Sequence, residues 1–167
     1  MNKHLIAPLT AGILLALAGA AQAATRTATI NVSANVVDNC IISAGALNLG
    51  TFDGTNDLAA NSNIVVRCSI GTDYTVDLST GTSGSYANRT LANGAFSLVY
   101  NLYTANDYQT IWGNNQNGTG HASGLGAGMG TTNAITHTVY GRLLATQNQG
   151  PVDAGTYSDT ITATITY

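Results

Sequence analysis

The chain has 167 residues and a formal net charge of −3, with eight aspartates, no glutamate and only five lysines and arginines together. Basic residues are nowhere clustered, which argues against a nucleic-acid partner. Thr, Ser, Asn and Gly fill the polar positions and suit solvated sheet faces and turns, whereas Lys and Glu, which favour helix surfaces, are nearly absent. The composition therefore predicts an all-β protein.

Residues 1–23 have the pattern of a secretory signal peptide. Lys3 precedes a short apolar run, and the segment ends in Ala21-Gln22-Ala23, the small-x-small pattern that comes before a signal-peptidase site. The run is short and rich in Ala and Gly for a membrane span, so an uncleaved anchor is the weaker alternative. We expect an exported mature chain that begins at Ala24 and keeps four arginines against eight aspartates, a net charge of −4.

The first segment of the mature chain alternates between apolar and small polar residues. The apolar residues, each two positions from the next, are Ala28, Ile30, Val32, Ala34 and Val36. Thr, Asn and Ser lie between them, and this period of two predicts a β-strand with one buried face. The pattern leaves open whether that face enters the core of its own chain or the core of another molecule.

Further strands are predicted at short spacing, separated by Gly- and Asn-rich turns. They are residues 41–52, 62–70, 73–80, 95–104, 136–145 and 155–167. Short strands with frequent turns and one-sided alternation favour a β-sandwich. Residues 113–132 are polar and Gly-rich, and we expect a mobile surface loop there, a connection rather than a binding loop.

The last predicted strand mirrors the first. Its apolar residues Ile161, Ala163, Ile165 and Tyr167 alternate with threonines, and the strand ends on a core-type residue. Exposed sheet edges invite pairing between molecules, so the first strand of one chain could complete the sheet of the next.

Two cysteines, Cys40 and Cys68, are present. Export implies an oxidising compartment, so we expect a structural disulfide that closes a loop of 29 residues. Closing a loop of that size stabilises a fold by about 3.6 kcal/mol. A lone pair without C-x-x-C spacing is a poor redox or zinc site.

No catalytic residue, metal site or cofactor is predicted, and we expect that the protein is not an enzyme. The sequence has no G-x-S-x-G elbow and no glutamate, and His121 and His137 have no evident catalytic partner. Aspartates in residues 53–57 and 153–159 could offer oxygens to Ca²⁺ but lack the EF-hand spacing. Trp112 with its neighbouring tyrosines Tyr103 and Tyr108 could form a sugar-stacking patch, although a place in the core or in a groove wall is the favoured interpretation.

Several stretches, in their order and spacing, resemble the spore coat protein U domain family. Within that family they are most similar to the pilins of archaic (Csu-type) chaperone–usher pili. The stretches are ANVVDNCIISAGALNLGTF, NIVVRCSIGTDYTVDLSTG, LVYNLYT with IWG, TVYGRL and GTYSDTITATITY, and together they cover nearly the whole mature chain.

The resemblance implies an incomplete immunoglobulin-like sandwich, with six strands and a vacant place for a seventh. A periplasmic chaperone fills that place first. At the outer-membrane usher the N-terminal extension of the next subunit replaces the chaperone strand, which builds a surface fibre for adhesion and biofilm formation. The domains implied are a signal peptide at residues 1–23, a donor-strand extension at residues 24–37 and a pilin domain at residues 38–167.

The resemblance also assigns roles to residues. The five alternating apolar residues of the extension would be the plugs of the donor strand. Ile161, Ala163, Ile165 and Tyr167 would border the acceptor groove, and Cys40 and Cys68 fall where the family's disulfide is expected. Only 16 residues separate Ala24 from Cys40, which leaves no room for an additional binding domain and favours a shaft subunit. A minor or adaptor subunit and a secreted coat protein are the alternatives, as is, less favoured, a calcium- or sugar-binding module.

Overall fold

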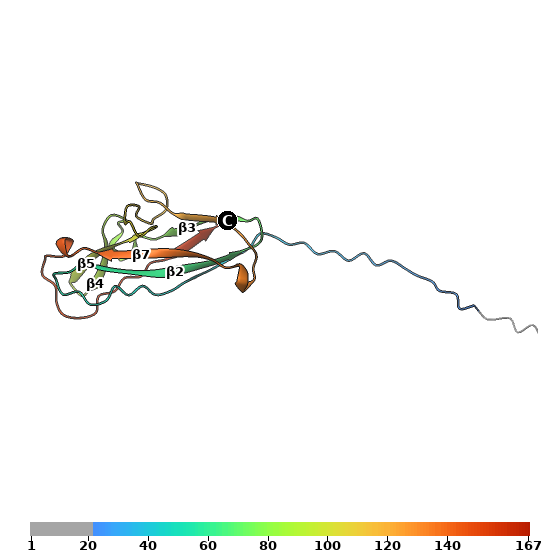
Figure 1. Cartoon of the computed structure of the whole chain (residues 1–167), viewed down its shortest axis with the longest axis horizontal. Helices are drawn as coiled ribbons and strands as arrows, with labels where there is room; N and C mark the ends of the chain where they lie inside the picture. The colour runs from blue at the N-terminus through green and yellow to red at the C-terminus, as the bar shows by residue number, and fades with distance from the viewer. Residues whose placement is uncertain (1–21) are drawn as a thin grey trace, which may run out of the picture. The chain divides into compact units, whose positions relative to one another are not determined.

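The structure, a computed structural model, describes residues 22–167 (Figure 1). All but the last two residues of the predicted signal peptide therefore lie outside the described residues. The chain divides into two units at the boundary between Asn35 and Val36. All of the described strands belong to the second unit.

The regular secondary structure of the described residues is almost entirely β-strand. Its strands are β1 Cys40–Ala44, β2 Leu58–Cys68, β3 Asp73–Leu78, β4 Arg89–Asn93, β5 Phe96–Tyr103, β6 Ala122–Leu125, β7 Ile135–Leu143 and β8 Ala163–Thr166. Three short 3-10 helices complete it: η1 Gly81–Ser83, η2 Thr131–Asn133 and η3 Ala145–Gln147. Within residues 22–167 no helix has both the length and the apolar character needed to cross a membrane. The all-β prediction is confirmed.

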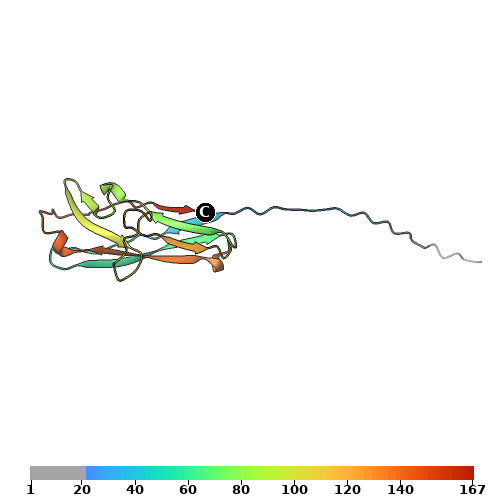
Figure 2. The ribbon, with the colours of Figure 1, turned by 90° about the horizontal axis from the view of Figure 1, so that it is seen from above.

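Two antiparallel sheets form the sandwich (Figures 1 and 2). The larger sheet has the order β1-β2-β7-β5-β4, and the smaller has the order β6-β3-β8. Alternate residues of the strands point inward, and the side chains that they bury include Ile64, Val66, Tyr74, Val76, Leu78, Leu98, Tyr100, Leu102, Val139 and Leu143. The period of two in the sequence therefore produces one shared core between the sheets.

Two strands were not predicted. In β4 the only large apolar residue is Leu91, so its alternation is too weak to detect. The strand exists because it forms a hairpin with β5, in which Asn93 pairs with Phe96 across a two-residue turn. Gly94 supplies the positive φ of 58° in that turn.

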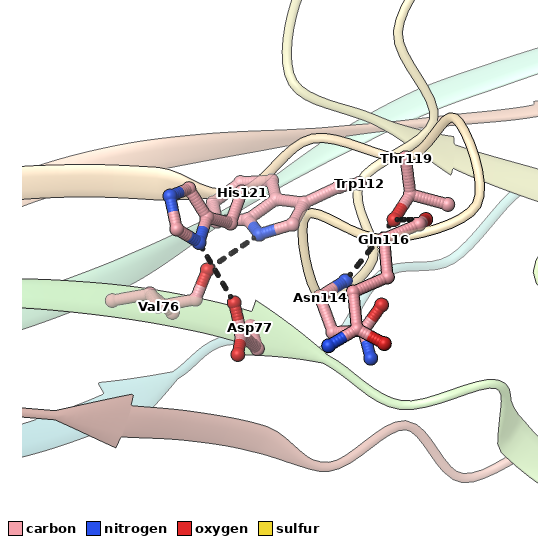
Figure 3. A network of polar contacts seen from close by, with 7 residues as sticks. All are labelled: Val76, Asp77, Trp112, Asn114, Gln116, Thr119 and His121. Atoms are coloured by element: carbon pink, nitrogen blue, oxygen red, sulfur yellow. Dashed lines mark hydrogen bonds and ion pairs between the residues drawn. The ribbon is translucent and has the colours of Figure 1, made fainter.

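The second unpredicted strand, β6, corrects our expectation of a mobile loop at residues 113–132. β6 pairs with β3, and Gly124 lies so close to the Tyr74 ring that a Cβ atom would clash with it. Ahead of β6 the segment is also tied down by side chains (Figure 3): His121 Nδ1 lies 3.1 Å from Asp77 Oδ1, and the Thr119 hydroxyl donates to the Gln116 carbonyl at 2.7 Å. Glycine here permits close packing rather than looseness.

Trp112 belongs to the core, as the favoured reading had it. Its side chain is only 1% exposed, and its Nε1 donates to the carbonyl of Val76 at 2.8 Å (Figure 3). The other two members of the suggested sugar patch, Tyr103 and Tyr108, instead contact each other edge to face at 5.3 Å between ring centroids. A sugar patch centred on the indole is therefore wrong.

Arg89 is a fully buried cation at the start of β4. Its guanidinium donates to the carbonyls of Ser79 and Trp112 at 2.7 Å and to the side-chain oxygen of Asn101 at 2.8 Å. Burial lowers the pKa of Arg89 below its ordinary value, though it stays a cation. These bonds join the β4 edge to the segment that follows β3 and to β5, so one side chain helps to close the end of the sandwich.

His137 makes a hydrogen bond across the sandwich. Its Nε2 lies 2.9 Å from the Tyr74 hydroxyl oxygen on the opposite sheet, and its ring meets Trp112 edge to face at 6.4 Å between centroids. Burial lowers the pKa of His137 below its ordinary value. The folded domain therefore binds a proton at this ring less readily than the unfolded chain does.

Acidification should destabilise the domain through His137. Because its folded pKa lies below the unfolded value of about 6.5, the free energy of unfolding should be constant above that pH and should fall as the pH drops through it. Urea midpoints measured from about pH 7.5 to about pH 5.5 test this. His137→Gln should flatten the dependence. Equal slopes for His137→Gln and the parent chain would contradict the assignment.

Candidate strand-acceptor groove

The two sheets leave a gap between two of their edge strands. β1 is paired only with β2, and β8 is paired only with β3. Within residues 22–167, no hydrogen bond joins residues 44–52 with residues 157–166. On the sides that face the gap, both stretches therefore have no strand beside them, at the margins of the same core.

A groove follows this gap. One part of it has a volume of about 380 Å³ and lies between residues 44–49 on one side and residues 159–163 on the other. A neighbouring part of about 710 Å³ continues along residues 47–52 and 152–159. Side chains common to both parts are Leu47, Leu49, Leu91 and Asp159. The two parts together form one continuous depression, which we call the acceptor groove.

The floor of the acceptor groove is the hydrophobic core itself. Ile64, Leu78 and Leu102 line its first part and are each no more than 5% exposed. Around them, half-buried apolar residues of both walls pack against the core without being covered. Apolar surface arranged in this way is stabilised by any extended segment that covers it.

The wall at residues 157–165 keeps a strict period of two. Odd-numbered positions are half-buried and even-numbered positions are exposed, although only β8 at its end forms regular ladder pairs. The odd-numbered residues Tyr157, Ile161, Ala163 and Ile165 pack against the core. This stretch therefore has the side-chain pattern of a strand along its whole length.

Three of the four predicted groove-edge residues lie in or beside the acceptor groove, and the fourth lies elsewhere. Ile161 and Ala163 line the acceptor groove, and Ile165 packs against the core next to them. Tyr167 is 56% exposed and lines a separate shallow depression with Tyr74 and other residues.

The N-terminal extension, taken by itself, has no regular secondary structure. Residues 22–39 are all exposed, and Ile30, Val32 and Val36 are 84%, 89% and 85% exposed. Ala28 and Ala34, the small members of the alternating set, are exposed as well. Three large apolar side chains in water are costly for a segment that has no partner.

Sequence analysis missed one polar position in the groove. Asp159 lies in the half-buried phase of its wall and accepts hydrogen bonds from the Tyr100 hydroxyl at 2.8 Å and the Thr82 amide at 3.0 Å. Burial alone would raise the pKa of Asp159, but bonds from Thr82, Tyr100 and Thr160 hold it below its ordinary value. Burial, and then the bond to this carboxylate, raise the pKa of Tyr100. The pair is therefore a carboxylate and a neutral phenol at neutral pH.

The alternation of residues 157–165 in the sequence already places Asp159 among the inward-facing positions. Asp159 is the one charged residue in phase with Tyr157, Ile161 and Ala163, although residues 153–159 taken as a group suggest a calcium site. The other candidate aspartates accept hydrogen bonds close to them in the fold, Asp153 from the Ala154 amide and Asp57 from the Ala145 amide. Asp53 accepts from the Thr55 amide and then from Asn56, which hold its pKa well below the usual range. Among the described residues, no three His, Cys, Asp or Glu side chains gather as a metal site.

Cys40 and Cys68 form the predicted disulfide, with 4.1 Å between their Cα atoms. They lie opposite each other in the β1–β2 ladder. The bond fixes the wall of the groove that contains β1 to the neighbouring strand β2 of the larger sheet. This prediction is confirmed.

The chain is an all-β sandwich with a disulfide-fixed edge strand and an apolar groove between two strand edges. A model of the Spore Coat Protein U domain matches residues 26–164, and the chain belongs to that family. It is 35% identical to Protein U of Myxococcus xanthus over 184 residues, covering 99% of this chain and 98% of that protein.

Among solved structures the chain is similar to one from Acinetobacter baumannii. That structure is the CsuC–CsuE chaperone–tip adhesion subunit pre-assembly complex from archaic chaperone–usher Csu pili. The match has 26% identity and a TM-score of 0.56, and it covers 79% of this chain and 40% of the solved chain. The present chain thus spans about two fifths of the length of the solved chain. The chain therefore shares its family with Protein U and its fold with a chain of a pilus-subunit complex.

Proposed function

We propose that the protein is a non-enzymatic structural subunit of a chaperone–usher surface pilus and that it polymerises by donor-strand exchange. In this proposal the extension of one subunit fills the acceptor groove of the next. The fibre is exported through the periplasm and supports adhesion and biofilm formation. The partners are identical or related subunits, a periplasmic chaperone and an outer-membrane usher.

One observation carries the proposal. The acceptor groove exposes core side chains between two unpaired strand edges, and the extension of the same chain exposes a strand-like row of apolar side chains. Each feature has what the other lacks, since the groove needs apolar side chains and backbone partners, and the extension has both. In this proposal the chain consists of a signal peptide at residues 1–23, a donor-strand extension at residues 24–37 and a pilin domain at residues 38–167.

The energetics favour a durable junction. Burying Ile30, Val32 and Val36 contributes about 1.5–3 kcal/mol for each side chain. Hydrogen bonds along the two groove edges add about 1 kcal/mol each. Because the contacts form along one strand, they must break together, and dissociation should be slow without any covalent link.

Deleting residues 24–36 should give a subunit that accepts a donor strand but cannot donate one. Co-expressed with a chaperone and usher, it should form no polymers alone, and in mixtures it should shorten the polymers of the parent chain. Ile161→Asp is the matched control, since it places a charge in the groove and spares the extension. Unheated denaturing gels measure polymer length, and they should show no polymers of the deletion variant alone and shorter polymers in the mixtures. Normal polymers from the deletion variant alone would rule out the proposal.

A secreted coat-type structural protein is the second candidate, because the matching family is named after a spore coat protein. In that case the extension need not join chains. A ladder of heat-sensitive polymers of the exported protein would favour the pilus subunit, and its absence would favour the coat-type protein.

A further inference from the structure

We propose that Asp159, held by Tyr100, sets the register of the donor strand and that Ala34 is the donor side chain that lies against it. This inference rests on the proposed donor-strand function and adds which residue of the extension meets which position of the groove. It starts from the one charged residue that lines both parts of the groove, Asp159.

Asp159 occupies a special place along the groove. It lines both parts of the groove, so it lies where the two meet. Its side chain is in phase with Ile161 and Ala163 and therefore faces the space that a donor strand would enter. The donor residue beside it faces a carboxylate, whereas the in-phase wall residues on either side, Tyr157 and Ile161, are apolar and pack against the core.

Hydrogen bonds hold the Asp159 carboxylate in place. One oxygen accepts from the Tyr100 hydroxyl at 2.8 Å, and the other accepts from Thr82 and from the Thr160 amide. Behind it the backbone of Gly81, at φ 65°, lies so close that a Cβ atom there would collide with the carboxylate. A donor side chain must therefore be small at this point, because a large apolar one would overpack the site and strip water from the charge.

The extension offers two small plugs, Ala28 and Ala34, and only one of them has the right neighbours. Since groove extends to both sides of Asp159, the residue beside it needs large apolar plugs on both sides. Ala34 has Val32 before it and Val36 after it, each about 7 Å away in an extended strand. Ala28 is the first of the five plugs, so placing it at Asp159 would leave one part of the groove empty. The spacing therefore selects Ala34.

The test measures binding of a labelled synthetic peptide of residues 24–37 to the purified mature chain. An Ala34→Leu peptide should bind at least about tenfold more weakly than the parent peptide, and Ala28→Leu, the matched control, should differ by less than about threefold. An Asp159→Ala chain should recover most of the loss for the Ala34→Leu peptide, as a double-mutant cycle.

The outcomes separate the two proposals. If the parent peptide binds and Ala34→Leu binds equally well, or Ala28→Leu loses more, the register inference is wrong and donor-strand exchange stands. If the parent peptide does not bind or stabilise the chain at all, the proposed function fails, and the register inference fails with it. Should Asp159→Ala not fold, the comparison of the two leucine peptides on the parent chain still decides.

Discussion

Replacing Val32 with aspartate should abolish polymerisation while leaving the domain folded. Val32 is 89% exposed in the extension, so the substitution costs the free chain nothing. In a filled groove the new carboxylate would be buried without a partner, at a cost of several kcal/mol. Export with a chaperone and usher, followed by an unheated denaturing gel, should show monomers in place of a ladder.

The matched control is Asn31→Asp, one residue away on the polar face of the same strand. That side chain is expected to stay in water, so polymers should form at nearly the parent level. Equal loss in both variants would mean that charge on the extension, rather than its position on the strand, prevents assembly. Equal polymer formation in both would contradict burial of the apolar face.

Removing the disulfide as Cys40→Ala with Cys68→Ala should lower the free energy of unfolding by about 3.6 kcal/mol, the loop-closure value for its loop. Cys68 is also 1% exposed in the core, so its truncation adds a small packing loss. Urea unfolding of the parent domain with and without reductant measures the loss of loop closure. Unfolding of the double variant measures that loss together with the packing loss at Cys68.

Reductant supplies the internal control, because it should destabilise the parent chain and leave the double variant unchanged. A parent chain that unfolds at the same urea concentration in both conditions would contradict a stabilising role. With stability of about 5–15 kcal/mol typical of small domains, a loss of this size should also reduce the yield of exported subunit.

The fold class and the disulfide could be predicted from sequence because each rests on a local or pairwise rule. Alternation at β2, β3 and β5 reflects burial on one face, and two cysteines in an exported chain have one possible pairing. β4 and β6 were missed because tertiary partners create them. β6 in particular has no apolar alternation, and its Gly124 matters through close approach to Tyr74, which no periodicity reveals.

The candidate site was predictable in part. The same alternation predicts the apolar row of the extension and the wall with Ile161 and Ala163. Asp159 was missed since a carboxylate in a turn-rich stretch suggests a loop, and its Tyr100 partner lies 59 positions away in sequence. Trp112 shows the opposite case, because an aromatic residue near tyrosines can be mistaken for a surface patch until its burial is seen.

The position of the disulfide has a mechanical consequence. Cys40 is the first residue of β1, and the extension precedes it by only a few residues. In a fibre built as proposed, a pulling force on the extension reaches the domain at this point. The bond to Cys68 passes that force to β2, an 11-residue strand paired on both sides, so β1 cannot be peeled from the sheet one hydrogen bond at a time. Under tension the covalent anchor therefore shares the load across the larger sheet, and the acceptor groove keeps its shape while the fibre is stretched.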